Sequence, residues 1–169
     1  MAKEYKKDYK NKIPNKEPSF QKILNFYLFE CPVKGYSERG ITFKELGWQK
    51  HKFSTLKANL LEGATPSLKK NYYPCKKDQL GDKFKIVESV KFADEYCVFL
   101  IHNDRKINSL FIAIRNAFAH GSFSVRSYNK TKIYFFSNFN KYLKAEIILQ
   151  ERTLLNWIKV VNPISYTKK

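Results

Sequence analysis

Cysteine, acidic residues and long apolar runs are all scarce in this chain, and each scarcity excludes a class of protein. The three cysteines, Cys31, Cys75 and Cys97, lie far apart and have no Cys-x-x-Cys or Cys/His metal spacing. The sequence therefore predicts neither a disulfide framework nor a structural metal site. No apolar run is long enough to cross a bilayer, and the N-terminus has no hydrophobic signal core, so we expect a cytoplasmic protein without a membrane partner.

Two features of nucleotide and nucleic-acid enzymes are also missing. The chain has no glycine-rich phosphate loop and no carboxylate cluster of the kind that two-metal nucleases use. We therefore expect a protein that needs no cofactor and no metal ion for its activity.

Positive charge is what the chain has in excess. Lysine and arginine number 32 against 15 acidic residues, which gives a formal net charge of +17. Such an excess favours a polyanionic partner, because neutralising phosphates releases counterions. The abundance of lysine is also typical of an AT-rich genome, but that bias does not explain the shortage of acids.

The pattern of residues along the chain indicates one domain with a basic extension. Residues 1–18 are rich in lysine and lack apolar periodicity, so we expect a flexible tail. Residues 19–81 are expected to form an N-terminal helical part, beginning with Ser19 as N-cap, that includes a loop over 64–81. Residues 82–165 are expected to form the core of the protein.

Within that core the hydrophobic period changes once. Apolar residues recur at helical spacing from 82 to 102 and again from 107 to 120, and two helices joined by so short a break are expected to pack antiparallel. After Gly121 the period falls to two, which predicts strands before a last helix over 150–161. The expected fold class is α+β, mainly α, with a hairpin or meander appended to a helical bundle.

One helix carries the candidate chemistry. On a helical wheel its apolar residues share a stripe, whereas Asn116 and His120 lie together on another side. Arg115 lies about 140° from His120, so a distorted last turn or a second copy of the chain must bring the two together. Ala113 and Ala119 share the second face and leave room for another backbone. The apolar stripe consists of Ile107, Leu110, Phe111, Ile114 and Phe118.

Arginine, asparagine and histidine together suit the transesterification of RNA. Histidine can remove the proton of a ribose 2′-OH or protonate the leaving 5′ oxygen, and arginine can stabilise charge on the phosphoryl oxygens without a metal. An arginine and a histidine near a helix end are also typical of surface groups or of a C-terminal cap, and Gly121 is a natural residue to follow such a cap.

The run from Arg115 to Gly121, Arg-Asn-Ala-Phe-Ala-His-Gly, resembles the RNxxxH signature of the HEPN superfamily, the higher eukaryote and prokaryote nucleotide-binding domains. Arg115, Asn116 and His120 fill the positions of the signature. The resemblance implies a HEPN-like helical bundle that acts as a homodimer, with arginine and histidine of two protomers meeting in one cleft.

The resemblance also implies a function. Many members of the superfamily are metal-independent endoribonucleases that serve as toxins or antiviral defence effectors, so RNA and a cognate antitoxin or regulator are the implied partners. A subset carries a tyrosine two residues after the histidine, where this chain has Ser122.

A stretch after the motif mixes basic and aromatic residues. Arg126, Tyr128, Lys130 and Lys132 are candidates for binding the RNA substrate, because such residues contact phosphates and stack on bases. A half-buried hairpin explains the same pattern.

The remaining titratable candidates are weaker. His51 and His102 have no partner at metal spacing and are interpreted as ordinary residues without a functional role. Asp94, Glu95 and Asp104 are candidates for orienting the motif residues, and surface ion pairing is the alternative.

Two other functions fit the same sequence. The protein could be a non-catalytic RNA- or nucleotide-binding module in which the motif only holds phosphate. It could also be a protein-interaction regulator that uses its basic tail as the contact.

Overall fold

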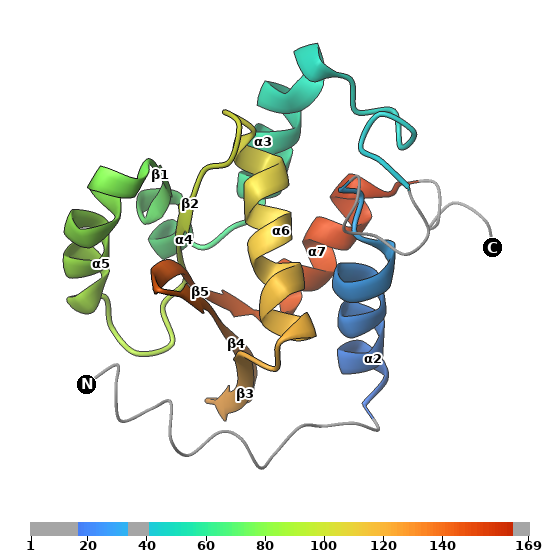
Figure 1. Ribbon diagram of the computed structural model, residues 1–169. Helices are drawn as coiled ribbons and strands as arrows, with labels where there is room; N and C mark the ends of the chain where they lie inside the picture. The colour runs from blue at the N-terminus through green and yellow to red at the C-terminus, as the bar shows by residue number, and fades with distance from the viewer. Residues whose placement is uncertain (1–16, 34–40, 164–169) are drawn as a thin grey trace.

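A five-stranded mixed sheet organises the protein, in the strand order β1-β2-β5-β4-β3. The structure, a computed structural model, describes residues 17–33 and 41–163 (Figure 1). The basic tail expected over 1–18 therefore lies almost entirely outside the described residues. The strands are β1 (Tyr72–Cys75), β2 (Tyr96–Leu100), β3 (Phe123–Tyr128), β4 (Thr131–Asn140) and β5 (Tyr142–Gln150).

The helices differ in which face of the sheet they cover. In Figure 1, β1 and β2 lie between α5 and α6, and α2, α3, α6 and α7 contribute to the larger hydrophobic core on the α6 side. The helical segments are α2 (Pro18–Leu24), the π-helical turn η1 (Asn25–Glu30), the 3₁₀ turn η2 (Lys50–Lys52), α3 (Phe53–Glu62), α4 (Pro66–Lys70), the 3₁₀ turn η3 (Lys77–Gln79), α5 (Leu80–Glu88), α6 (Lys106–Ala119) and α7 (Glu151–Val161).

The expectation of a HEPN-like helical bundle is wrong, because the protein is built on a five-stranded sheet. The helix predicted over 82–102 ends at Glu88, Ala93 adopts a positive φ of 74°, and Tyr96–Leu100 form strand β2. Cys97 and Phe99 face the larger core, whereas Tyr96 and Val98 face the smaller one. A strand that is buried on both faces is apolar throughout, so it shows no alternation that would distinguish it from a buried helix.

The strands after the motif are not an appendage. β3, β4 and β5 form an antiparallel meander, and β5 pairs directly with β2. The β3–β4 turn has positive φ at both Asn129 and Lys130, as a type I′ hairpin requires. The meander therefore supplies most of the sheet on which α6 packs.

The loop expected over 64–81 contains a short helix, α4, and the edge strand β1. Thr65 caps α4 by accepting a hydrogen bond from the Leu68 N–H at 3.2 Å. β1 pairs parallel with β2 in the register Tyr72↔Cys97, and Pro74 is tolerated because β1 has a neighbour on one side only. The first helix likewise begins one residue before the expected cap, with Pro18 at its first position and Glu17 as N-cap.

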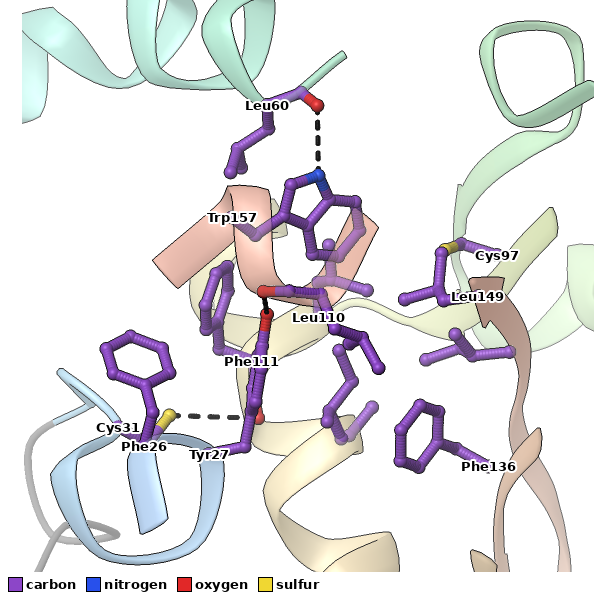
Figure 2. Packing of buried hydrophobic residues seen from close by; sticks show 14 of the residues in the cluster. Phe26, Tyr27, Cys31, Leu60, Cys97, Leu110, Phe111, Phe136, Leu149 and Trp157 are labelled. Carbon is purple, nitrogen blue, oxygen red and sulfur yellow. Dashed lines mark hydrogen bonds between the residues drawn. The ribbon is translucent and has the colours of Figure 1, made fainter. Parts of the chain in front are cut away.

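Phe111 of α6 is at the centre of the larger core (Figure 2). Its ring centroid is 5.8 Å from that of Tyr27 and 6.2 Å from that of Trp157. The polar atoms of these neighbours are satisfied at the same time, since the Tyr27 O–H donates to Leu154 O and the Trp157 Nε1–H donates to Leu60 O, both at 2.9 Å. Residues of the expected N-terminal part and of the expected core part thus share one hydrophobic interior.

Replacing Phe111 by alanine should lower the free energy of unfolding by about 3–5 kcal/mol, because it leaves a cavity among packed rings. The matched control is Phe139→Ala, whose side chain is 73% exposed and whose loss should change stability by less than about 0.5 kcal/mol. Urea denaturation followed by tryptophan fluorescence measures both. Equal effects of the two substitutions would contradict the central position of Phe111.

Candidate functional site

The last turn of α6 ends in a regular helix cap. The N–H of His120, the C-cap residue, donates to Asn116 O at 3.0 Å. Gly121 follows with φ +63°, and the N–H groups of Gly121 and Ser122 return to carbonyls of the last helical turn at 3.2 and 2.8 Å. This is the Schellman arrangement, and it satisfies carbonyls that the end of a helix would otherwise leave unpaired.

Asn116 connects the other two motif residues. Its side-chain Oδ1 accepts a hydrogen bond from Arg115 Nη1 at 3.2 Å, and its backbone carbonyl accepts the His120 N–H. Arg115 is half-buried, whereas His120 is exposed. The backbone bond is the ordinary one of the helix, so the side-chain contact is between Arg115 and Asn116 alone; we call these three residues of the last two turns of α6 the polar strip.

The side chains of Arg115 and His120 do not meet within one chain. Because α6 is regular through Ala119, their separation stays at about 140° around the helix and about 7.5 Å along it. The distorted last turn that the sequence left open is absent. Among the described residues, the His120 side chain has no hydrogen bond or ion pair, so its imidazole is free to act on a ligand.

Arg115 lies toward the end of η1. Burial raises the pKa of the Cys31 thiol to about 12, and the positive charge of Arg115 opposes that rise. Cys31 is the C-cap residue of η1, where a nearby cation also interacts favourably with the helix end. Within the described ranges, Arg115 Nε is buried without a hydrogen-bond partner, so this part of the guanidinium is withdrawn from solvent.

The face with small residues is partly covered by the same chain. Ala113 is only 7% exposed, and its carbonyl accepts a hydrogen bond from Asn138 Nδ2 at 2.8 Å. Asn138 lies at the irregularity of β4, where the register with β5 shifts. The Asn138 side chain of β4 thus reaches Ala113, and Ala119 is the small residue that stays exposed.

The four residues expected to bind substrate do not share one face of the sheet. Phe123 and Val125 of β3 pack against the larger core on the α6 side. Because side chains alternate along a strand, Arg126 and Tyr128 lie on the opposite face of the sheet. Lys132 pairs across the hairpin with Ser127, which is on the same face as Val125, so Lys132 lies on the α6 side.

The local partners of these four residues differ as well. Lys132 is ion-paired with Glu17 and lies 4.0 Å from Glu151, and Lys130 occupies the exposed hairpin turn. The guanidinium of Arg126 lies 5.0 Å from the centre of the Phe92 ring, and Tyr128 packs edge-on against the same ring at 5.1 Å. Of the four residues, Arg126 and Tyr128 therefore share a cluster around Phe92, whereas Lys132 does not. The sequence could not distinguish them, because all of them lie in one basic and aromatic stretch.

Glu95 has a structural position that its sequence context did not reveal. Its carboxylate is fully buried and accepts hydrogen bonds from Thr65 Oγ1 and from the Gln150 N–H, both at 2.7 Å. It thereby ties α4 to the end of β5. Asp104 precedes the opposite end of α6 from His120, about 20 Å away along the helix, so it does not orient the imidazole.

Neither a metal site nor a bilayer crossing is found in the described part of the chain. No three His, Cys, Asp or Glu side chains of residues 17–33 and 41–163 are grouped so that they could hold a metal ion. No helix in the same ranges combines the length and the apolar character that spanning a membrane requires. His51 and His102 are both exposed.

Gly121→Ala should destabilise the protein by about 1–2 kcal/mol, because an alanine resists the left-handed conformation that this position adopts. No atom lies within 4 Å of the added methyl group, so the effect comes from the backbone alone. The matched control is Gly81→Ala in α5, where φ is ordinary and the space is equally open. That change should be neutral or stabilising by up to about 1 kcal/mol in thermal unfolding.

Stability should fall at alkaline pH, because the folded pKa of Cys31 lies above its usual 9.0. Below about pH 9 the thiol is protonated in both the folded and the unfolded chain, so the free energy of unfolding does not depend on it. As the pH rises from 9 toward 12 the unfolded chain loses this proton first, and the free energy of unfolding falls. Between pH 7.5 and pH 10 the free energy of unfolding should therefore fall by about 1 kcal/mol less in Cys31→Ala than in the parent protein. Identical pH profiles in chemical denaturation would contradict the burial of this thiol.

Comparison of the chain with models of known protein families, with curated proteins and with solved structures found no match. The features that bear on function are therefore the geometry of α6, the charge of the chain and its RNxxxH sequence.

Proposed function

We propose that this protein is a metal-independent endoribonuclease that cleaves RNA by attack of the ribose 2′-OH on the adjacent phosphorus. The observation that carries the proposal is the polar strip at the end of α6, where an exposed imidazole follows a guanidinium held by Asn116. The same three residues fill the RNxxxH signature that the sequence shares with HEPN ribonucleases.

The residues divide the chemistry between them. His120 takes the proton of the 2′-OH or gives one to the leaving 5′ oxygen, since histidine exchanges protons near neutral pH. Arg115 stabilises the charge that accumulates on the phosphoryl oxygens, for which a planar guanidinium is well suited. Asn116 orients that guanidinium through its 3.2 Å hydrogen bond.

The separation of Arg115 and His120 supports a site made by two copies of the chain. About 140° of helix rotation keeps the two groups apart in one protomer. A homodimer that places α6 against its symmetry mate joins the Arg115 of one protomer to the His120 of the other. In this proposal the protein is a toxin or antiviral defence effector, held inactive by an antitoxin or another regulator.

A non-catalytic RNA-binding module is the second candidate. The net charge of +17 and the packing of Arg126 and Tyr128 on Phe92 favour binding whether or not a bond is cleaved. A protein-interaction regulator is the third, and RNA affinity that is weak and insensitive to salt would favour it.

His120→Ala should abolish cleavage of total RNA in the presence of EDTA and leave RNA affinity within a few-fold, because the imidazole acts on a proton and contributes little to binding. The matched control is His51→Ala, which removes an exposed histidine elsewhere. Gel analysis of the products, with mapping of 2′,3′-cyclic phosphate ends, measures cleavage. If the parent protein binds RNA but cleaves none, the binding-module function replaces the nuclease.

Arg115→Ala should lose both cleavage and part of the RNA affinity, since it removes a phosphate contact as well as transition-state charge. Arg105→Ala is the matched control, because Arg105 is an exposed arginine just before the other end of α6. Circular dichroism confirms that each variant is folded. Cleavage by Arg115→Ala at the parental rate would remove Arg115 from the site.

A further inference from the structure

The face of the sheet that α6 does not cover carries tyrosine rings with lysines above them. Tyr73 of β1 and Tyr142 of β5 pack against the smaller hydrophobic core, together with Leu80 and Val87 of α5. Figure 1 shows α5 on the far side of β1 and β2 from α6. We call this region the lysine–tyrosine surface, and it consists of Tyr73, Lys77, Lys83, Tyr142 and Lys144.

Each ring of this surface has at least one ammonium group near its centre. Lys83 Nζ lies 4.9 Å from the Tyr73 ring centre, and Lys77 Nζ lies 4.9 Å from that of Tyr142. Lys144 Nζ approaches the Tyr142 ring as well, at 5.6 Å. These are cation–π distances, which hold positive charge beside the flat aromatic faces.

The lysines of this surface have rings as partners and not carboxylates. Within the described ranges, no carboxylate forms an ion pair with Lys77, Lys83 or Lys144, whereas Lys132 is paired with Glu17. Their positive charge therefore remains available to an anionic ligand.

The sheet register fixes the spacing of the two rings. Tyr73, Val98 and Glu146 lie in one row across β1, β2 and β5, and Tyr142 is four residues from Glu146. Two strand spacings and four residues along a strand place Tyr73 and Tyr142 about 16 Å apart. Both rings are half-buried against the smaller core, so this separation is held by packing and does not depend on a loop.

We propose that the lysine–tyrosine surface binds single-stranded RNA. Bases stack on Tyr73 and Tyr142, while Lys77, Lys83 and Lys144 move from the rings to the phosphates between them. Ring faces with adjacent lysines are the elements that bind single strands without sequence preference. An A-form duplex keeps its bases stacked inside the helix, so it cannot use the two rings.

This inference does not depend on cleavage at α6. The surface lies on the opposite face of the sheet from Arg115 and His120, as the alternation of β2 between the two cores requires. A substrate strand bound here is held by the protein before or after its scissile phosphate reaches α6, and it binds equally well if no bond is broken.

The test is the affinity of the full chain for a fluorescent 2′-O-methyl oligouridine of about a dozen nucleotides, a length within known single-strand site sizes. This probe has no free 2′-OH and is therefore not cleaved. Tyr73→Leu/Tyr142→Leu should weaken binding about tenfold or more, because base–aromatic stacking is lost at two positions. Tyr73→Phe/Tyr142→Phe, which keeps the rings, should bind within about twofold of the parent.

The lysines are tested separately, in case the leucine variant does not fold. Lys77→Gln/Lys83→Gln/Lys144→Gln should weaken binding and reduce the slope of log K against log salt concentration by about two, as three lost phosphate contacts predict. The matched control is Lys44→Gln/Lys50→Gln/Lys52→Gln, which removes the same charge from exposed lysines of the segment that precedes α3.

Three results would overturn the proposal. They are an equal loss of affinity in the two lysine variants, unchanged binding by a folded leucine variant, and equal affinity for duplex RNA. Vesicles of phosphatidylserine serve as the other polyanion, and a lysine variant that loses vesicle binding but keeps oligouridine binding would assign the surface to membranes. Because the probe has no free 2′-OH, its binding reports on this surface whether or not α6 cleaves RNA, which separates a failure of this surface from a failure of the nuclease.

Discussion

Strand β2 is buried on both of its faces, and the rest of the structure depends on that double burial. Cys97 and Phe99 point into the core beneath α6, and Tyr96 and Val98 point into the core beneath α5. Burying a side chain such as Phe99 or Val98 contributes roughly 1.5–3 kcal/mol to folding. Because β2 also pairs with β1 on one edge and β5 on the other, it joins the two cores into one body.

The position of the candidate site follows from this arrangement. α6 is held on the sheet by its apolar stripe, from Ile107 to Phe118, and by the bond from Asn138 to the Ala113 carbonyl. The Schellman cap then ends the helix at His120 and turns the chain into β3. The polar strip is consequently the part of α6 that neither the sheet nor η1 covers completely, and its imidazole faces outward.

Sequence reasoning predicted the elements whose periodicity is one-sided. α6, α7 and the strands of the meander alternate between apolar and polar faces, and the Gly121 cap was visible as a glycine after a helical run. The 140° between Arg115 and His120 also followed from spacing alone. The prediction of a HEPN-like bundle was wrong, because β2 is apolar on both faces. The sequence Tyr-Cys-Val-Phe-Leu fits a buried helix as well as a buried strand. The pairing of Lys132 with Glu17 and the cover that Asn138 gives Ala113 join residues far apart in the chain, and no local pattern contains them.

We propose that the two faces of the sheet have different functions: α6 carries the groups that act on RNA, and the α5 side carries the lysines and rings that hold it. In this proposal Arg115 of one protomer acts with His120 of another. The most direct measurement is RNA cleavage by Arg115→Ala and His120→Ala chains that are mixed, unfolded and refolded together. Half of the dimers then contain one chain of each variant, and one of the two sites in such a dimer is intact, so we expect about a quarter of parental activity from two inactive proteins. A mixture as inactive as its components would contradict it.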